Sequence, residues 1–361
     1  MKPPPFVLFV PYYGRGGSGE FVRSVTLAQA LAKRWPQLRI EFLLPGGPGT
    51  RQDAPFPKIC HEGPEQEKGA FDSLHIARLR PDLVVFDCGG RSASLRTCKR
   101  LGITSAYISD REGTLKKPFR LDWLWLLDEH WHQREHVTVD SLLPTQRLLG
   151  RFSVTRRAYF DTYYAEDEAD WSPLPASLRA ALDQPYVLLS PGGGGYALDG
   201  RPVSEVFVEV AERLHAATGL QCLSLLGPLY QGTIRSATTH TETNLPQPLF
   251  RELMRRARLV LTNGGHSLHQ ALAMQAVCVV APLGGSDQPA RISAYDRAGL
   301  VVAAAPNAQA LGDAALQLLQ HEEAHRAVAE RVAALRIVNG IPVMCARIGE
   351  RLGLGQGGDG T

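Results

Sequence analysis

Short apolar runs alternate with helical patterns along the chain. In the first half, runs at 6–10, 39–44, 82–87 and 105–110 are rich in β-branched and aromatic residues, which is typical of buried strands. After the first run, residues 21–35 gather apolar side chains on one helical face. Strands separated by helices in this way predict a parallel sheet with helices on both faces.

The second half repeats this alternation. It predicts strands at 186–190, 221–227, 259–263, 277–282 and 301–305. It predicts helices at 203–217, 249–257, 267–275, 308–319 and 322–335. The fold class that follows is α/β, with two doubly wound Rossmann-like domains. Such sheets bind ligands beyond the carboxyl ends of their strands, and we expect the domains to face each other across a cleft.

The domain boundaries follow from a change in composition. Residues 165–185 are acidic, contain proline and show no strand pattern. We therefore predict a first domain at 1–165, a linker at 166–184 and a second domain at 185–340. Residues 341–361 are expected to form a terminal helix and a disordered, glycine-rich tail.

Composition and charge limit the classes of function that the protein can have. The 361 residues are 44% hydrophobic and 21% charged, as in an ordinary folded protein. A net charge of +3 is too small to indicate nucleic acid as a partner but suits an anionic ligand. The six cysteines form no C-x-x-C pair, so neither zinc nor a disulfide framework is indicated. The first apolar run is too short for a secretion signal, so we expect a cytoplasmic protein.

Three glycine-rich turns follow predicted strands, at 12–23, 190–195 and 262–267. Each can present backbone N–H groups to an anion, although glycine also simply permits tight turns. The third is the strongest candidate, because Ser267 is expected to cap a helix whose N-terminus favours a phosphate. The next strand leads to Asp287, which emerges at the same sheet edge and suits sugar hydroxyls.

The stretch 259–290, LVLTNGGHSLHQALAMQAVCVVAPLGGSDQPA, resembles the donor-binding signature of inverting GT-B glycosyltransferases. The closest resemblance is to the MurG-like and UDP-glycosyltransferase families. It implies a phosphate site at Gly264 and Gly265 and a sugar site at Asp287 and Gln288. Gln270 stands where these families have a ribose-binding Glu, and Asn263 where many have His. His266 is either a phosphate contact or a solvated loop residue.

The resemblance extends upstream of this stretch. The turn 190–195 matches the one that opens the donor domain and adds Gly193 and Gly194 to the expected donor site. The segment 244–257 matches the loop and helix that pass the nucleobase, and places Leu245 there. Residues 17–31, GSGEFVRSVTLAQAL, follow the spacing of the first turn in these families.

Two carboxyl groups are candidates for the catalytic base. Glu20 stands where many relatives have a catalytic His, and a desolvated carboxylate can take a proton from an acceptor hydroxyl. The alternative is that Glu20 only stabilises the first turn of its helix. Asp87 ends a predicted strand. It can serve as the base, orient a neighbouring group, or simply face the cleft.

Basic residues lie on the expected acceptor side. Arg15 and Arg23 flank the first turn, and Arg111 follows the fourth strand together with Lys116, Lys117 and Arg120. They suit a phosphate-bearing or acidic acceptor, or anionic lipid head groups, which would place the protein at the inner face of the membrane. Residues 119–131 are expected to form a core helix. Three nearby histidines are not spaced like metal ligands and are expected on a helix: His130, His132 and His136.

The resemblance implies a glycosyltransferase that transfers a sugar with inversion from a nucleotide donor, UDP in these families, to an acceptor hydroxyl. It implies neither a cofactor nor a metal, because helix N-termini and loop amides stabilise the leaving diphosphate. It also implies that the last helix, 342–352, packs on the first domain. Two alternatives remain open: a nucleotide-sugar hydrolase of the same fold and a non-catalytic nucleotide-sugar binding protein.

Overall fold

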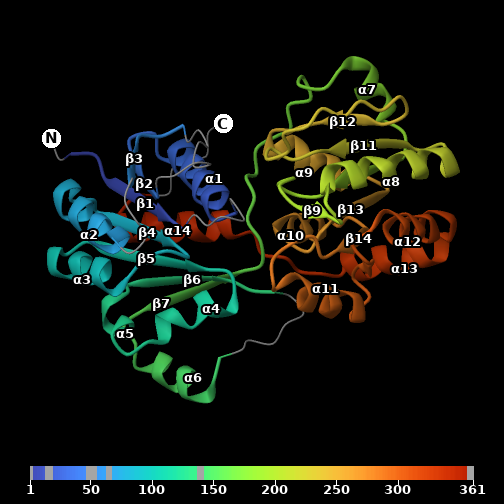
Figure 1. Cartoon of the computed structure of the whole chain (residues 1–361). Helices are drawn as coiled ribbons and strands as arrows, with labels where there is room; N and C mark the ends of the chain where they lie inside the picture. The colour runs from blue at the N-terminus through green and yellow to red at the C-terminus, as the bar shows by residue number, and fades with distance from the viewer. Residues whose placement is uncertain (1–2, 13–18, 46–54, 62–66, 136–141, 356–361) are drawn as a thin grey trace. The chain divides into compact units, whose positions relative to one another are not determined.

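A computed structural model describes residues 3–12, 19–45, 55–61, 67–135 and 142–355. Within these ranges the chain divides into two compact units (Figure 1). The first unit contains the described residues up to 165 and returns at 338. The second unit contains residues 166–337. The chain therefore leaves the first unit once and comes back to it with its last helix.

A parallel sheet forms the centre of the first unit. In the described residues it has seven strands in the order β3-β2-β1-β4-β5-β6-β7. Their bounds are β1 Phe6–Pro11, β2 Arg39–Pro45, β3 Lys58–His61, β4 Leu83–Asp87, β5 Thr104–Ser109, β6 Glu129–Gln133 and β7 Arg156–Phe160. Since β1 lies between β2 and β4, its last residue pairs with Asp87 at the carboxyl edge of the sheet.

Helices cover both faces of this sheet. They are α1 Gly19–Arg34, α2 Lys68–Leu79, α3 Ser92–Leu101, α4 Glu112–Leu115, the 3₁₀ helix η2 Lys117–Phe119, α5 Trp123–Leu126, α6 Pro144–Arg151 and α14 Gly340–Leu352. One apolar cluster joins α1 and α14 to one face, through side chains such as Leu27 and Ile348. A second cluster joins α2 and α3 to the other face, through Ile76 and Leu95.

The second unit has the same plan. Its parallel sheet, over the described residues, has six strands in the order β12-β11-β8-β13-β14-β15. The strands are β8 Tyr186–Ser190, β11 Gln221–Leu225, β12 His240–Glu242, β13 Leu259–Asn263, β14 Cys278–Ala281 and β15 Val302–Ala303, with a small hairpin of β9 Ala197–Leu198 and β10 Arg201–Pro202. The helices are α7 Ala176–Ala181, α8 Val203–Thr218, α9 Gln247–Arg256, α10 His266–Ala273, α11 Gln288–Arg297, α12 Ala308–Gln320 and α13 Glu322–Ala333.

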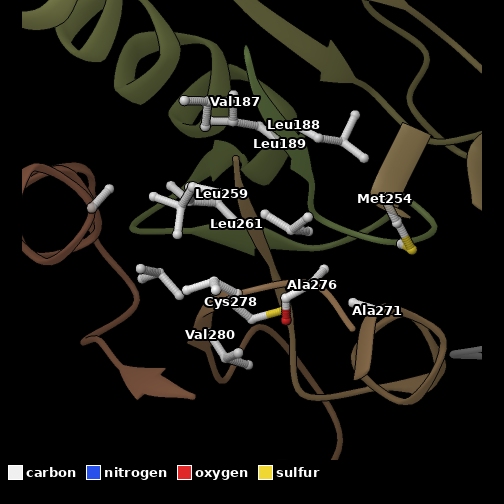
Figure 2. Close-up of a cluster of buried hydrophobic side chains, with 14 of the residues drawn as sticks. Val187, Leu188, Leu189, Met254, Leu259, Leu261, Ala271, Ala276, Cys278 and Val280 are labelled. Carbon is white, nitrogen blue, oxygen red and sulfur yellow. The ribbon is translucent and has the colours of Figure 1, made fainter. Parts of the chain in front are cut away.

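One continuous apolar core holds the second unit together. Figure 2 shows part of it, where three neighbouring strands present Leu188, Leu261 and Val280. Met254 of α9 and Ala271 of α10 belong to the same core. Because strands β8, β13 and β14 are buried throughout, their apolar runs are continuous rather than alternating, as the sequence showed.

The predicted fold class is confirmed, since each unit is a parallel sheet between helices. Six strands of the described residues were not predicted: β3, β6, β7, β9, β10 and β12. Strands β9 and β10 have two residues each. The other four are short and rich in polar residues; β3, β7 and β12 lie at a sheet edge, and β6 lies next to one. The expected helix through His130 and His132 is wrong, because both belong to strand β6.

The predicted linker and tail carry more structure than the sequence suggested. Helix α7 lies within the predicted linker, and Leu174, Leu178 and Leu182 from this stretch are buried in the core of the second unit. In the tail, the carbonyl of Gly355 accepts a hydrogen bond from Trp35 Nε1 at 3.1 Å, so the first tail residues are not disordered. Residues 356–361 lie outside the described part. No helix of the described residues is long and apolar enough to cross a bilayer.

Candidate functional site

Three carboxyl groups gather at the carboxyl edge of the first sheet. Asp87 is the last residue of β4, Asp110 directly follows β5, and Glu20 lies in the first turn of α1, which follows β1. In a parallel sheet these positions share one edge, which explains why residues far apart in sequence meet. Glu20 and Asp87 were predicted here, whereas Asp110 was not. The available signal was the same as for Asp87, an acidic residue at the end of an apolar run.

Arg23 holds these carboxylates together. Its guanidinium donates to both oxygens of Asp87, with Nε 2.9 Å from Oδ2, and Nη2 lies 3.2 Å from Asp110 Oδ2. Nη1 donates to Gln133 Oε1 at 3.1 Å, and the Ser24 hydroxyl also donates to Asp87. Arg23 is 2% exposed and one turn along α1 from Glu20. The expectation that Arg23 contacts the acceptor is therefore wrong, because its donors are used inside the protein.

Glu20 is the carboxyl group best prepared for proton transfer. Burial, with the nearby charges of Asp110 and Asp87, raises the pKa of Glu20 to about 7. Its Oε1 lies 3.4 Å from Nη2 of Arg111, which is half exposed. By contrast, burial raises the pKa of Asp87 while the bound Arg23 favours its ionised form. A carboxyl group with a pKa near 7 can both take and release a proton at neutral pH.

Cys88 completes this cluster in an unusual conformation. It follows Asp87 with a φ of 53°, a left-handed backbone that non-glycine residues adopt rarely and that often marks a functional site. Its thiol donates to Asp110 Oδ1 at 3.1 Å, and burial raises the thiol pKa well above its ordinary value. Cys88 therefore stays protonated and acts as a hydrogen-bond donor. No pattern in the sequence pointed to this role.

The cluster also has distances suited to a metal. The possible ligand atoms of Glu20, Cys88 and Asp110 lie within 4.8 Å of one another. Among the described residues, these three side chains form the group that could hold a metal ion. However, Arg23 Nη2 lies 3.3 Å from the Cys88 sulfur and 3.2 Å from Asp110. A guanidinium thus already supplies positive charge to two of the three ligands, and a cation of higher charge would be repelled.

The loop between β13 and α10 is built around Asn263. Its Oδ1 accepts from the Gly265 N–H at 2.9 Å, and its Nδ2 donates to the Pro191 carbonyl at 3.0 Å. One side chain therefore joins the glycine-rich turns at 190–195 and 262–267. Gly264 is needed for space, since a Cβ there would lie 2.7 Å from Ile292 of α11.

The start of α10 differs from the expected one. The helix begins at His266 with Gly265 as its N-cap, so the prediction that Ser267 caps it is wrong. The Gly265 N–H is used by Asn263 and is not available to a phosphate. The N–H groups of the first helical turn, from His266 and Ser267 onward, remain the groups that a helix N-terminus offers to an anion.

Asp287 and Gln288 lie at the same sheet edge, at the start of α11. Asp287 is half exposed and pairs with Arg291 at 2.7 Å, and Arg291 also donates to the Gly264 carbonyl at 2.7 Å. This arginine, which sequence reasoning missed, ties the two loops together. Gln288 Oε1 accepts from the N–H of Leu283 at 3.1 Å, and within the described residues its Nε2 donates no hydrogen bond. The bonded Oε1 thus orients the Gln288 amide and leaves its Nε2–H groups available as donors.

The other residues expected to contact the donor differ in how open they are. Gln270 donates to Gln247 of α9 at 3.3 Å and is 4% exposed, so its amide is engaged between two helices. Leu245 is buried in the core, which makes it a packing residue rather than an open contact. Gly193 accepts from the Leu229 N–H at 2.9 Å, and Gly194 has a φ of 76° against the loop after β11. Arg15 and His136 lie outside the described residues.

Solved structures with this fold share little sequence with the chain. The spinosyn forosaminyltransferase SpnP is 16% identical with a TM-score of 0.62, covering 96% of this chain and 99% of its own. UGT2 of Phytolacca americana, complexed with UDP-2-fluoro-glucose and pterostilbene, is 12% identical with a TM-score of 0.60, covering 97% and 100%. A putative UDP-N-acetylglucosamine 2-epimerase from Listeria monocytogenes is 15% identical with a TM-score of 0.58, covering 99% of each chain.

These similarities extend over the whole length of both chains in each pair, so they concern the complete two-unit fold. They confirm the resemblance to GT-B proteins and identify the two units as its two Rossmann-like domains. No protein-family model matches the sequence, and no curated protein matches it either.

Proposed function

We propose that the protein is an inverting glycosyltransferase that moves a sugar from a UDP-linked donor to an acceptor hydroxyl. Its GT-B fold is shared with sugar transferases, one of them bound to a UDP sugar. The observation that carries the proposal is the buried Glu20 carboxyl with a pKa of about 7. Inverting transfer needs one such base, and the other two carboxylates of the cluster are held by Arg23.

In this reaction Glu20 takes the proton of the acceptor hydroxyl. The acceptor oxygen forms a bond to the anomeric carbon from the face opposite the diphosphate. The bond between that carbon and the diphosphate oxygen breaks, and its electron pair leaves with UDP. Arg23 keeps Asp87 and Asp110 fixed, so that their charge favours the protonated form of Glu20 and strengthens it as a base.

The donor is assigned to the second unit. The N-terminus of α10 offers its first-turn N–H groups and the positive end of the helix dipole to the diphosphate, which stabilises the leaving UDP. Gln288 Nε2 and the half-exposed Asp287 carboxylate suit sugar hydroxyls, one as donor and one as acceptor. Asn263 and Arg291 shape this loop without contacting the donor.

The test is binding followed by turnover. UDP and UDP sugars should raise the melting temperature, because a ligand at 100 times its dissociation constant stabilises the folded state by about 2.7 kcal/mol. Donors that respond are then incubated with a panel of hydroxyl acceptors, and proton NMR should show a β-glycoside from an α-linked donor. Retention of configuration, or no thermal response to any uridine nucleotide, would refute the proposal.

Epimerisation of a UDP sugar is the second candidate. A putative UDP-N-acetylglucosamine 2-epimerase shares the fold over 99% of each chain. Incubation with UDP-N-acetylglucosamine alone separates the activities. A new UDP sugar indicates an epimerase, free sugar a hydrolase, and unchanged donor is expected for a transferase without its acceptor.

A further inference from the structure

The ring of Tyr196 lies against the loop that leads to Asp287 and Gln288. A Cβ on Gly284 would lie 2.2 Å from Cε1, 2.5 Å from Cζ and 2.7 Å from Cδ1 of Tyr196. These three nearest atoms belong to one ring, so the ring occupies the space that a side chain at position 284 would need. Glycine at 284 and tyrosine at 196 therefore form a matched contact between two distant segments of the chain.

The position of this ring is fixed within the second unit. The Tyr196 carbonyl accepts a hydrogen bond from the N–H of Val203, the first residue of α8, at 2.9 Å. The side chain is half-buried and packs against the core of the second unit, and β9 follows it directly in the chain. An anchored, half-buried ring is a rigid surface on which a loop can rest.

The loop on the other side of this contact depends on its neighbours for its shape. Gly285 and Ser286 are exposed, and Gly285 has a φ of 82°. Two successive glycines give the backbone many conformations unless neighbouring groups restrict it. Two neighbours restrict it at Gly284: the Tyr196 ring, and Gln288 Oε1, which accepts from the Gly284 N–H at 3.4 Å.

Gln288 connects this contact to the proposed sugar site. Its Oε1 also accepts from the Leu283 N–H at 3.1 Å, and this orients the amide whose Nε2 is proposed to meet a sugar hydroxyl. Asp287 Oδ1 lies 2.9 Å from the position of a Cβ on Gly285, the residue after Gly284. A shift of the Gly284 backbone would therefore disturb both the Gln288 amide and the surroundings of the Asp287 carboxylate.

The proposed diphosphate site is held by other contacts. The loop at 262–267 is tied to Pro191 through Asn263 and to α11 through Arg291. Those hydrogen bonds do not involve the Tyr196 ring. Loss of the ring should therefore affect the sugar end of the donor more than its diphosphate end.

We infer that Tyr196 is a positioning residue for the donor sugar, whose ring holds the Gly284 loop in the conformation in which Asp287 and Gln288 bind sugar hydroxyls. The inference rests on the proposed function only in its donor, because it requires a UDP sugar in the second unit and no particular acceptor. A loop that is ordered before the sugar binds removes that entropic cost from binding. Tyr196 should therefore strengthen the binding of a UDP sugar and leave the binding of UDP unchanged.

The experiment titrates the full chain by calorimetry with UDP and, separately, with UDP-glucose and UDP-N-acetylglucosamine. Tyr196→Ala removes the ring, and Tyr196→Phe keeps it. Gly284→Ala tests the contact from the other side, since its methyl group meets the ring, and it decides the question alone if Tyr196→Ala does not fold. Trp171→Ala is the matched control, because Trp171 is another half-buried aromatic residue packed against the same core.

Wild type, Tyr196→Phe and Trp171→Ala should have similar affinities for at least one UDP sugar. Tyr196→Ala and Gly284→Ala should each bind that sugar about tenfold more weakly, as for the ordering of one or two groups, and bind UDP within about twofold of wild type. In the double variant the two losses should not add, because the methyl group at 284 no longer meets a ring. In ligand-free Tyr196→Ala, the amides of Leu283 and Gly284 should exchange hydrogen faster than in wild type.

Equal weakening of UDP and UDP-sugar binding by Tyr196→Ala, or unchanged binding of both, would overturn the inference and leave the proposed donor in place. So would additive losses in the double variant, or unchanged hydrogen exchange at Leu283 and Gly284. If wild type binds no uridine nucleotide, the proposed function is refuted and this inference with it. The same titrations therefore distinguish the two failures.

Discussion

Individual side chains in the first unit show how burial raises the proton affinity of an ordinary carboxyl group. Glu20 is 8% exposed, and the two neighbouring carboxylates are fixed by Arg23 rather than free to move away. Desolvation is the largest cause of the raised pKa, and the charges of Asp110 and Asp87 add to it. The same arrangement assigns different tasks to chemically similar groups.

We predict that kcat/KM of transfer rises with pH and levels off above about 7, because Glu20 must be deprotonated to act as a base. Glu20→Gln should lower kcat by about 10²- to 10⁴-fold and remove this dependence. Glu209→Gln, a change at an exposed surface glutamate, is the control and should keep both. The measurement is a pH–rate profile with a responding donor and acceptor.

Asp110→Asn sharpens this test. Removing a nearby negative charge should lower the pKa of Glu20, so the midpoint of the profile should move to lower pH. An unchanged midpoint would show that another group titrates and that Glu20 is not the base.

Asp72, on helix α2, is another buried carboxyl group. It is 1% exposed, its Oδ1 has no hydrogen-bond partner in the described residues, and burial raises its pKa to about 6. Because this folded-state pKa lies above the unfolded value, its contribution to stability is fully present below about pH 4. That contribution is lost as the pH rises through about 6.

We therefore predict that Asp72→Asn gains stability relative to wild type as the pH rises from 4 to 7. The difference should reach about 2–3 kcal/mol, from roughly two pKa units. Urea unfolding at several pH values measures it, with the exposed Asp183→Asn as the control. Parallel curves for wild type and Asp72→Asn would mean that Asp72 titrates normally in the folded protein.

Whole elements set the shape of the second unit's turns. The turn after β8 packs so tightly against the loop after β11 that a Cβ on Gly194 would lie 2.2 Å from the Leu226 carbonyl oxygen. Gly194 also has a φ of 76°, so it is constrained twice. Gly200, in the turn between β9 and β10, has a φ of 78° but open space around it.

Alanine substitutions at these two positions separate the cost of a left-handed backbone from the cost of a steric clash. Gly200→Ala should destabilise by about 1–2 kcal/mol through its left-handed backbone alone. Gly194→Ala should cost about 1–3 kcal/mol more, because backbone atoms rather than a flexible side chain meet the new methyl group. Chemical denaturation measures both. Equal losses would mean that the turn can shift without disturbing the core.

The sequence predicted those elements whose burial repeats along the chain. Strands such as β8 and β13 are buried on both faces and read as apolar runs, so they were found. Strand β6 was missed because it serves several neighbours: Glu129 bonds Arg347 and Arg351 of α14, Gln133 bonds Arg23, and His130 and His132 share the Ser109 hydroxyl. Such polar partners come from distant segments, which no local pattern reveals.

The site was predictable to the same extent. Glu20, Asp87 and the loop at 262–267 were found because they follow strands, and the topology brings strand ends together. The roles of Arg23, Cys88 and Arg291 depend on hydrogen-bond partners up to about 110 residues away in the chain. Arg23 illustrates the difference, since the same position was expected to contact an acceptor and proves to be buried.

The whole molecule consists of two units that each bury a core of their own. The first unit is closed by α14, which the chain adds after completing the second unit, and which packs against α1. Because α1 carries Glu20 and Arg23, the last helix supports the element on which the proposed base lies. The loop at 262–267, by contrast, is supported by Pro191 and Arg291 of the second unit.

This separation predicts where a bound nucleotide stabilises the chain. UDP at 100 times its dissociation constant should slow backbone hydrogen exchange in β13 and α10. For amides that exchange by opening of the second unit, the slowing should correspond to about 2.7 kcal/mol. Amides of β1, β4 and β5 should exchange at unchanged rates, because their core contains no residue of the second unit. Hydrogen exchange with mass spectrometry, on the full chain with and without UDP, measures both sets together. Protection of equal size in both units would show that the chain opens as one cooperative body, and protection confined to the first unit would remove the donor site from the loop at 262–267.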